Sequence, residues 1–447
     1  MKPINEIAAD LGIPLEGLES YGSYKAKIKL EALQTAGNKR RRGKLILVTS
    51  INPTPQGEGK TVTAIGLSSA LNRLGHRSVV CTRQPSLGPL FGIKGGAAGG
   101  GKSTVEPMLE INMRFTGDID AVGAAHNLLS AMIDNHIFHG NELGINPRMI
   151  RWSRTVDMND RALRHVIVGV DTKNDESSRE DSFVITAASE VMAILSLSKN
   201  YSDLKARLDE ILLGFDGKGR PVKAKDLRAS GAMSAILKDA LEPNLVQTSD
   251  QTPALVHCGP FGNIATGTSS LISILLGLYY SDYCVVEAGF GSDLGAEKFV
   301  DIVSRLGHFD VDAAVIVVSI KALKFHGVAE ELAGTEKTSV GRNQMLESSV
   351  VRGHMSGGLA NLQKHIENIR SFGIPPIVSI NRFPTDTDDE LKTVTDFCEG
   401  IGVPCATSNV FAEGANGGRE LAQLVSEVST GHHTNIPVYE MNDNTGK

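Results

Sequence analysis

The sequence predicts an α/β fold with a mostly parallel sheet and helices on both of its faces. Short apolar runs bounded by turn signals alternate along the chain with longer stretches of helical spacing. Each apolar run is continuous, as expected of parallel strands that are buried on both faces. The composition, 41% hydrophobic and 21% charged, is that of an ordinary globular protein.

Six apolar runs are the predicted strands. In chain order they are Leu45–Thr49, Ser78–Thr82, His165–Gly169, Tyr283–Glu287, Ala313–Val318 and Ile377–Ile380. Helical spacing predicts helices over Val62–Leu74, which Gly75 closes, over Ala187–Leu197 and over Asn361–Phe372. Strands separated by helices in this way suit a parallel sheet, because the chain must cross back over the sheet before each new strand.

Length and composition exclude several classes of protein. The chain has 447 residues and a net charge of −6, which does not favour nucleic acid as a partner. Its five cysteines are too scattered for a disulfide framework or a zinc site. The first residues lack the apolar core of a signal peptide, and no apolar run is long enough to span a bilayer. We therefore expect a cytoplasmic protein with no membrane partner.

The strongest local signal follows the first predicted strand. The segment LILVTSINPTPQGEGKTVTAIGL passes from a strand through a glycine-containing turn into a helix, which is the setting of a phosphate-binding P-loop. Thr54 replaces the first glycine of the usual pattern, and the alternative is an ordinary glycine-rich turn. The residues predicted to bind ATP are Thr54, Pro55, Gln56, Gly57, Glu58, Gly59, Lys60 and Thr61. Lys60 would contact the outer phosphates, and the Thr61 hydroxyl would hold Mg²⁺.

Three further residues are candidates for the site. Arg83 ends a predicted strand that we expect to neighbour the P-loop strand, and its guanidinium suits a phosphoryl or carboxylate group. Glu287 stands at the carboxyl end of another predicted strand, a favourable place for a metal contact. Asp118 lies in a segment rich in small residues. Taken singly, Arg83 could instead be a plain surface arginine, and each carboxylate a helix cap or a member of a solvated ion pair.

These segments form part of a long, ordered set of motifs. They include NPTPQGEGKT, RQPSLGPLFGIKGGAAGGG, INMRFTGD, RTVDMNDRALR, TPALVHCGPFGNIATG, EAGFGSDLGAEKF and EGANGGRELA. Together, from about Tyr21 to Leu424, they resemble the formate–tetrahydrofolate ligase family. The resemblance implies a P-loop NTPase-type fold and ATP-dependent joining of formate to tetrahydrofolate, with formyl phosphate as the intermediate. It also implies Mg²⁺, a monovalent cation (K⁺ or NH₄⁺) and a homo-oligomer, either a dimer or a tetramer.

The resemblance also assigns roles to residues. Lys60, Arg83 and Asp118 would be catalytic, with Arg83 holding formyl phosphate and Asp118 contacting the pterin-bearing substrate. Thr61 would hold Mg²⁺, and Glu287 is the second candidate metal ligand from its place at the end of a predicted strand. The cleft for the pterin ring would be formed by Asn381, Arg382, Phe383, Pro384, Ser408 and Phe411, with Phe383 stacking on the ring.

The expected organisation has two domains and a tail. Residues 1–340 would form the P-loop domain with an N-terminal extension, and 341–430 a smaller α/β domain that completes the substrate cleft. Residues 431–447 read as a tail. By the resemblance, the family continues with a C-terminal domain that is not expected here.

Several positions depart from what the family usually shows: Gln84, Arg114, His126, Thr266 and Phe411. Two alternatives therefore stay open beside the ligase. One is a diverged relative that makes formyl phosphate but formylates a different acceptor. The other is a non-catalytic P-loop switch ATPase.

Overall fold

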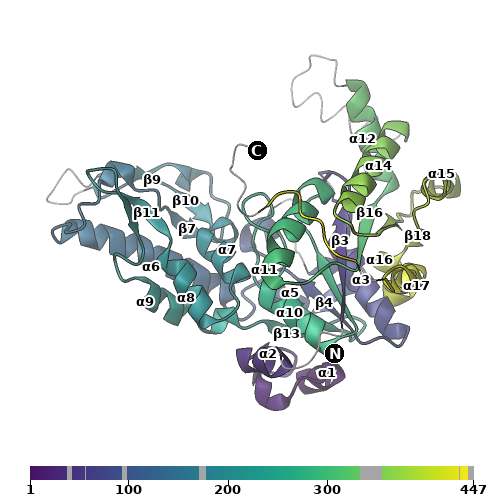
Figure 1. Ribbon diagram of the computed structural model, residues 1–447, viewed down its shortest axis with the longest axis horizontal. Coiled ribbons are helices and arrows are strands. Elements are labelled where there is room, and N and C mark those ends of the chain that lie inside the picture. Colours follow the sequence, from purple (N-terminus) through teal and green to yellow (C-terminus); the bar gives the residue numbers. More distant parts are fainter. Residues whose placement is uncertain are drawn as a thin grey trace.

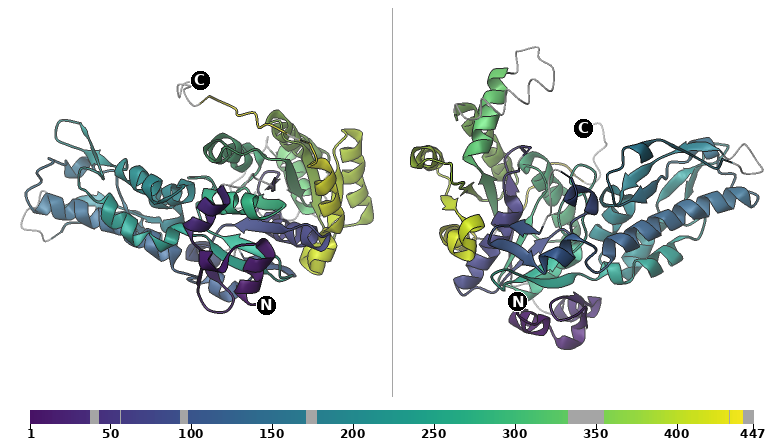
Figure 2. Two further views of the ribbon diagram at one scale, coloured as in Figure 1. Left: turned by 60° about the horizontal axis from the view of Figure 1, so that its bottom comes forward. Right: turned by 180° about the vertical axis from the view of Figure 1, so that it is seen from behind.

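The computed structural model describes residues 1–37, 43–55, 57–92, 98–170, 178–332, 355–431 and 433–440. Figure 1 shows two lobes, a main lobe built around one large sheet and a second lobe beside it that contains α6, α8 and α9. The N-terminal helices α1 and α2 lie together at the base of the main lobe (Figures 1 and 2). The predicted α/β class is confirmed.

The large sheet is parallel at its centre and antiparallel at one side. Its strands follow the order β1-β2-β13-β14-β4-β15-β3-β16-β17-β18. From β14 to β18 every neighbouring pair is parallel, whereas β1, β2, β13 and β14 pair antiparallel. The strands of this path are β1 Leu18–Ser20, β2 Ala26–Ile28, β3 Lys44–Ser50, β4 Ser78–Thr82, β13 Asn244–Thr248, β14 Pro253–Val256, β15 Tyr283–Glu287, β16 Ala313–Val318, β17 Pro376–Asn381 and β18 Cys405–Ser408. Strand β6 (Ser103–Glu106) pairs with β13 and with the short β5 (Gly99–Gly100).

Five of the six predicted strands lie in this sheet, as β3, β4, β15, β16 and β17. The prediction for His165–Gly169 is wrong as a buried strand. The structure has the short β8 (Val166–Val168) there, paired antiparallel only with β9 (Arg179–Asp181) in a separate hairpin. Ile167 is 72% exposed. The run is apolar, but Val166 and Val168 are only partly buried.

Helices cover both faces of the sheet, and successive residues of β3 separate the two cores. Leu45 and Leu47 face the core formed with α10 and α14, whereas Ile46 and Val48 face the core formed with α3 and α17. The main-lobe helices are α1 Ile4–Leu11, α2 Leu30–Gly37, α3 Lys60–Arg73, α4 Leu87–Leu90, α5 Met108–Asn112, α10 Leu271–Tyr280, α11 Arg305–Gly307, α12 Ile320–Leu332, α14 Ser356–Ser371, α15 Asp388–Gly400, α16 Val410–Glu413 and α17 Arg419–Val428. The three predicted helices correspond to α3, α7 and α14.

The second lobe was not predicted as a separate unit. It holds α6 (Asp118–Phe138), α7 (Glu190–Leu197), α8 (Tyr201–Asp209) and α9 (Ser230–Ile236). Small sheets lie beside these helices: β7 (Arg154–Val156) parallel to β10 (Phe183–Ile185), β8 with β9, and β11 (Leu212–Phe215) with β12 (Pro221–Lys223). Apart from β8, these short strands lie in no long apolar run, which explains why sequence patterns did not reveal them.

The segment after the expected boundary at residue 340 contributes to the same sheet. Strand β17 pairs with β16, and β18 pairs with β17. The division into two domains stays a prediction, since most of the boundary segment lies outside the described residues. Residues 433–440, expected as a tail, contact the main lobe: the Asn435 N–H donates to Asp310 Oδ1 (2.9 Å) and the Val438 N–H to Asp301 Oδ1 (2.8 Å).

Two expectations about the whole chain can be compared with the structure. Within the described ranges, no helix is both long and apolar enough to cross a membrane. Cys81, Cys258, Cys284, Cys398 and Cys405 are all free thiols in the structure.

Helix α10 packs so closely against the sheet at Gly277 that a side chain there would collide with its neighbours. A Cβ atom at this position would lie 2.5 Å from Cys284 Sγ and 3.1 Å from Val79 Cγ1. We expect Gly277→Ala to lower the thermal unfolding midpoint, with a loss of about 1–3 kcal/mol from overpacking. Gly231→Ala in α9 is the control, because a Cβ there meets open space. A Gly277→Ala protein as stable as the control would contradict this close packing.

Candidate active site

The predicted P-loop links the carboxyl end of β3 to the first turn of α3. Lys60 begins that helix, and its Nζ lies 3.0 Å from Ser50 Oγ and 3.5 Å from Glu58 Oε2. Burial lowers the pKa of the Lys60 ammonium, while the carboxylates of Glu58 and Glu287 oppose this effect. A buried ammonium at a helix N-terminus attracts phosphate oxygens strongly.

Glu58 folds back into its own loop. Its side chain is buried, and Oε1 accepts a hydrogen bond from the Thr54 N–H at 2.5 Å, while the Gly57 N–H donates to Thr54 O at 3.1 Å. The Glu58 carboxylate thus accepts a hydrogen bond from a backbone N–H and contacts the Lys60 ammonium. Both are groups of the kind that bind phosphate in a P-loop. Pro55 is exposed at the outer edge of the loop. Gln56 lies outside the described residues.

The carboxyl end of β17 contacts the P-loop directly. Asn381 Nδ2 donates a hydrogen bond to Glu58 O at 3.1 Å. Gly59 has a φ of +87°, and a Cβ atom there would collide with Asn381 Nδ2. Only glycine combines this left-handed conformation with so close an approach. The structure therefore brings together Asn381 and the P-loop, which are more than three hundred residues apart in the chain.

Glu287 lies between the P-loop strand and the strand of Arg83. The expectation that β4 neighbours β3 is wrong, because β15 lies between them in the sheet. Glu287 therefore reaches both sides: the Thr61 hydroxyl donates to Oε2 at 2.6 Å, and Arg83 Nε lies 3.5 Å from Oε1. Arg83 Nη1 also donates to Pro260 O at 3.3 Å. Glu287 is only 4% exposed, so these contacts are weakly screened.

Thr61 and Glu287 fit the donor set that Mg²⁺ prefers. Both present oxygen atoms, and these lie 2.6 Å apart at the start of α3. No cluster of three or more His, Cys, Asp or Glu residues within the described part of the chain could hold a metal by itself. Two protein oxygens, from Thr61 and Glu287, suit a Mg²⁺ ion that takes its remaining ligands from substrate phosphates and water.

Asp118 does not join this cluster. It begins α6 in a buried network, where Oδ1 lies 2.8 Å from Lys27 Nζ and Oδ2 accepts a hydrogen bond from Asn244 Nδ2 at 2.7 Å. Lys27 Nζ also donates to Glu242 O at 3.0 Å. Both oxygens of Asp118 have partners, and the residue is 3% exposed. Its placement shows a structural ion pair, and a role toward substrate stays a prediction.

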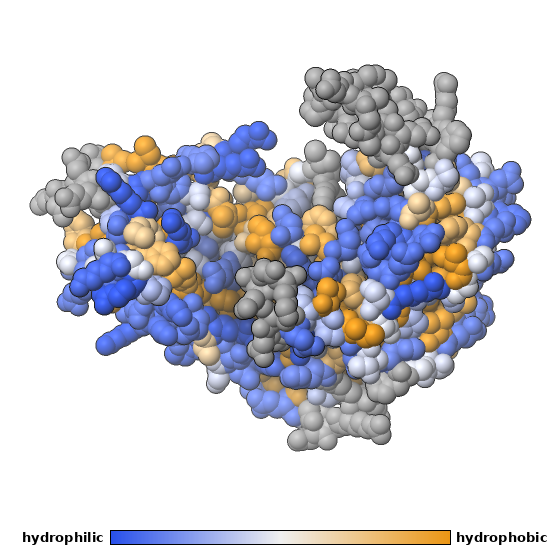
Figure 3. Space-filling view, turned by 45° about the horizontal axis from the view of Figure 1, so that its top comes forward, coloured by the Kyte–Doolittle hydropathy of each residue, from blue (hydrophilic) through white to orange (hydrophobic). Residues whose placement is uncertain are grey.

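The residues predicted to form the ring cleft follow two adjacent strands. Asn381 pairs in register with Ser408 at the ends of β17 and β18, and the Arg382 N–H donates to Ser408 O at 3.0 Å. Just beyond these positions Phe383 is 40% exposed and Phe411 55% exposed. Pro384 is also exposed. Two exposed aromatic rings at one sheet edge provide apolar surface for a flat ligand. Figure 3 shows that the molecule is hollowed between its two lobes.

Phe411 contacts the glycine-rich segment near Gly101. The Lys102 N–H donates to Phe411 O at 2.8 Å, and a Cβ atom on Gly100 would lie 3.2 Å from the Phe411 ring. Gly100 and Gly101 thus pack against the segment that carries a predicted ring-binding residue.

Sequence reasoning missed two residues that hold the P-loop. Ser50 accepts the Lys60 bond and donates to Phe290 O at 3.2 Å. Asn52 donates to Asp293 Oδ2 at 3.1 Å and accepts from Asn361 Nδ2 at 2.6 Å. Their position at the end of β3, directly before the loop, is the signal that could have identified them.

The other departures from the family pattern lie in different surroundings. Gln84 and Thr266 are buried, and each has a side-chain oxygen with no hydrogen-bond partner among the described residues. Arg114 is exposed, with Nη2 3.4 Å from Asp120 Oδ1. His126 stacks on Trp152 at a centroid distance of 4.1 Å, and burial lowers its pKa to about 4. Arg114 and His126 thus contact residues of their own surroundings. Of these four positions, Gln84 is the one next in sequence to a candidate catalytic residue, Arg83.

Comparison with known proteins agrees with the resemblance carried by the motifs. The family model described as formate–tetrahydrofolate ligase matches residues 1–447. A protein of Thermotoga petrophila named formate–tetrahydrofolate ligase is 51% identical over 443 residues, which is 99% of this chain and 79% of that protein. The family predicted from the motifs, among them the P-loop and the segments that carry Arg83 and Glu287, is confirmed. The chain belongs to the formate–tetrahydrofolate ligase family.

Proposed function

We propose that the protein ligates formate to tetrahydrofolate with ATP, giving 10-formyltetrahydrofolate, ADP and phosphate through formyl phosphate. The observation that carries this proposal is the Glu287 carboxylate, which contacts Thr61 of the P-loop with one oxygen and Arg83, the residue after β4, with the other. A phosphate bound by the P-loop would therefore lie beside a guanidinium suited to a second anion. Family membership supports ATP, formate and tetrahydrofolate as the substrates.

Formate needs activation because its carbonyl carbon is a poor electrophile. In the proposed sequence a formate oxygen attacks the γ-phosphorus, the bond to the β-γ bridging oxygen breaks, and ADP leaves. The N10 amine of tetrahydrofolate then attacks the formyl carbon, loses its proton, and expels phosphate, which keeps the oxygen that came from formate. Both steps move negative charge among phosphate oxygens, so fixed positive groups accelerate them.

Lys60 and Arg83 would supply the fixed positive charge. Lys60 would contact the β- and γ-phosphate oxygens, and Arg83 would orient formate and then the formyl phosphate carboxyl oxygen. Thr61 and Glu287 would hold Mg²⁺, which when bound neutralises charge on the phosphates. A monovalent cation remains part of the proposal on the family resemblance alone.

The folate ring would lie at the exposed aromatic edge. Phe383 and Phe411 are the residues proposed to contact the pterin, with Asn381, Arg382, Pro384 and Ser408 shaping the cleft. The exposure of both aromatic rings supports this role, since an unused core phenylalanine would be buried. A homo-oligomer, either a dimer or a tetramer, also stays part of the proposal.

Oxygen transfer tests this function directly. With ¹⁸O-labelled formate, ATP and tetrahydrofolate, one labelled oxygen should appear in the released phosphate, and acid treatment of the product should give 5,10-methenyltetrahydrofolate. Labelled phosphate without a folate product would favour a different formyl acceptor. ATP hydrolysis indifferent to formate would favour a switch ATPase and overturn the proposal.

Arg83→Gln is the matched variant for that experiment. It removes the guanidinium beside Glu287 and leaves the P-loop residues unchanged. We expect ATP affinity to change little, while label transfer slows by about a hundredfold, because one charged stabilising group is lost. Equal label transfer by the variant and the wild type would remove Arg83 from the proposed mechanism.

Gly59 should be far more sensitive to substitution than Gly57. Both have a positive φ, but a Cβ atom at Gly57 meets nothing, whereas one at Gly59 collides with Asn381. Gly59→Ala should therefore weaken ATP binding at least about tenfold more than Gly57→Ala. Isothermal titration measures both, with circular dichroism as the check on folding. Equal losses of affinity would show that the Asn381 contact has no effect.

Glu58 should set the alkaline limit of activity through Lys60. The carboxylate favours the charged ammonium, so Glu58→Gln should lower the pKa of Lys60 further. Lys60 is charged only below its pKa, so activity should be lost at a lower pH than in the wild type. The alkaline limb of the kcat/KM profile for ATP measures this shift. Glu399→Gln, at an exposed position near the end of α15, is the control and should leave that limb unchanged.

A further inference from the structure

One carboxylate of the second lobe bonds to the segment that carries Arg83. Asp157 Oδ1 accepts a hydrogen bond from the Ser86 hydroxyl at 2.6 Å, and Asp157 Oδ2 accepts one from the Leu87 N–H at 2.9 Å. Asp157 directly follows β7, whereas Ser86 and Leu87 lie at the start of α4, shortly after Arg83. Its two oxygens therefore join the second lobe to the segment after β4.

The surroundings of Asp157 make this a firm attachment. Within the described part of the chain, the hydrogen bonds of its carboxylate go to Ser86 and Leu87. Burial raises the pKa of Asp157, while these two hydrogen bonds oppose that effect. Hydrogen bonds to a carboxylate are stronger than those between neutral groups, and water competes little for Ser86, which is 5% exposed.

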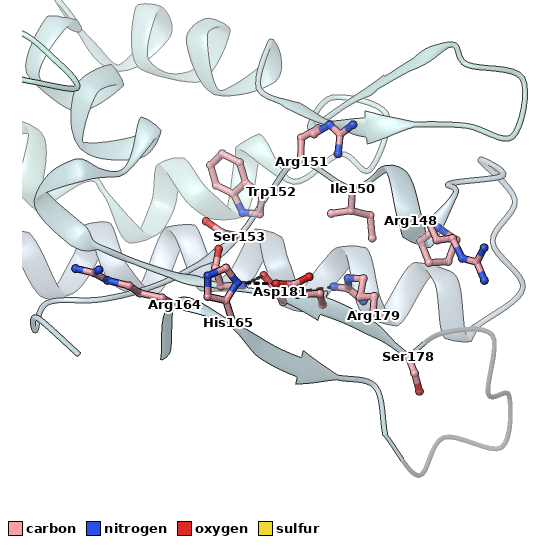
Figure 4. Close-up of a pocket in the computed structure, with 13 residues that line it drawn as sticks. Arg148, Ile150, Arg151, Trp152, Ser153, Arg164, His165, Ser178, Arg179 and Asp181 are labelled. Carbon is pink, nitrogen blue, oxygen red and sulfur yellow. Dashed lines mark hydrogen bonds and ion pairs between the residues drawn. The ribbon is translucent and has the colours of Figure 1, made fainter. Parts of the chain in front are cut away.

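The strand that ends directly before this carboxylate is held within the second lobe. The Thr155 N–H donates to Asn127 Oδ1, and Asn127 Nδ2 donates to Thr155 O, both at 2.9 Å. Arg154 bonds to the carboxylates of Asp134 and Asp181. Figure 4 shows this part of the second lobe, with Asp181 among the side chains that line the cavity next to β7. Strand β7 thus gives the carboxylate a fixed base.

The main lobe holds the other end of the segment. The Gln84 N–H donates to Cys258 O at 2.6 Å, and Arg83 Nη1 donates to Pro260 O at 3.3 Å. The chain after Gln84 is thus held by the main lobe at one end and by Asp157 at the other. Loss of either attachment would let it shift, and a displacement of about 1 Å at a reacting group can cost about a hundredfold in rate.

We propose that Asp157 is a positioning residue for Arg83. Its carboxylate holds Ser86 and Leu87, and thereby keeps the guanidinium beside Glu287, where formate and then formyl phosphate would lie. Asp157 acts through these hydrogen bonds and has no contact of its own with the reacting groups. The inference rests on the proposed function, and it gives the second lobe a part in that reaction.

Single variants test the attachment by the ¹⁸O transfer assay. Asp157→Ala should lower kcat/KM for formate by at least about tenfold, because Arg83 loses its fixed position, while the Kd of ATP changes little. Asp157→Asn should recover most of this loss, since its amide oxygen can accept from the Leu87 N–H and its amide nitrogen can donate to Ser86 Oγ. Asn200→Ala removes the N-cap of α8 in the same lobe and is the control, which should leave both constants unchanged.

A double variant separates positioning from a general loss of structure. If Asp157 acts through Arg83, Asp157→Ala should add less than about twofold to the loss that Arg83→Gln already causes. Full multiplication of the two losses, or an Asp157→Asn protein as slow as Asp157→Ala, overturns the proposal. Equal label transfer by Asp157→Ala and the wild type also overturns it and leaves the proposed function standing, whereas a wild type that transfers no label overturns both.

Discussion

The Glu287 carboxylate is the group on which the geometry of the candidate site depends. It stands at the end of β15, the strand between β3 and β4, and is almost completely removed from water. A buried carboxylate is tolerated only with partners, and its partners are the Thr61 hydroxyl and the Arg83 guanidinium. Satisfying one charge thus positions two groups from segments that follow different strands, Thr61 in α3 after β3 and Arg83 directly after β4, although β3 and β4 do not pair with each other.

A second constraint joins the C-terminal segment to the P-loop. The Asn381 amide bonds to Glu58 O over the position where Gly59 lacks a side chain. Strands β17 and β18 extend the central sheet, so this contact forms at the same edge as the ends of β3 and β15. The exposed rings of Phe383 and Phe411 follow directly, and their positions relative to the phosphate loop are fixed by backbone pairing.

The sequence revealed the centre of the fold but little of its margins. The apolar runs of β15 and β16 match the observed strands residue for residue, because parallel strands covered on both faces need continuous hydrophobicity. The same rule failed for β8, where only a local hairpin forms. Two features depend on contacts between distant parts of the chain: the position of β15 between β3 and β4, and the ion pair of Asp118 with Lys27. No local sequence pattern predicts such contacts. Ser50 and Asn52 were likewise identified only from their partners in the structure.

The Lys27–Asp118 network also bears on how the chain acquires its shape during synthesis. Lys27 leaves the ribosome early, yet its partners lie 91 and 215 positions later, in Asp118 and at the carbonyl of Glu242. Strand β2 likewise awaits Asn244 and Leu245 of β13. An ammonium that is fully buried in the finished protein must therefore stay hydrated until more than half of the chain has emerged. Closure of such distant contacts is slow, so the N-terminal segment joins the sheet late, after the lobe that begins at α6 has been made.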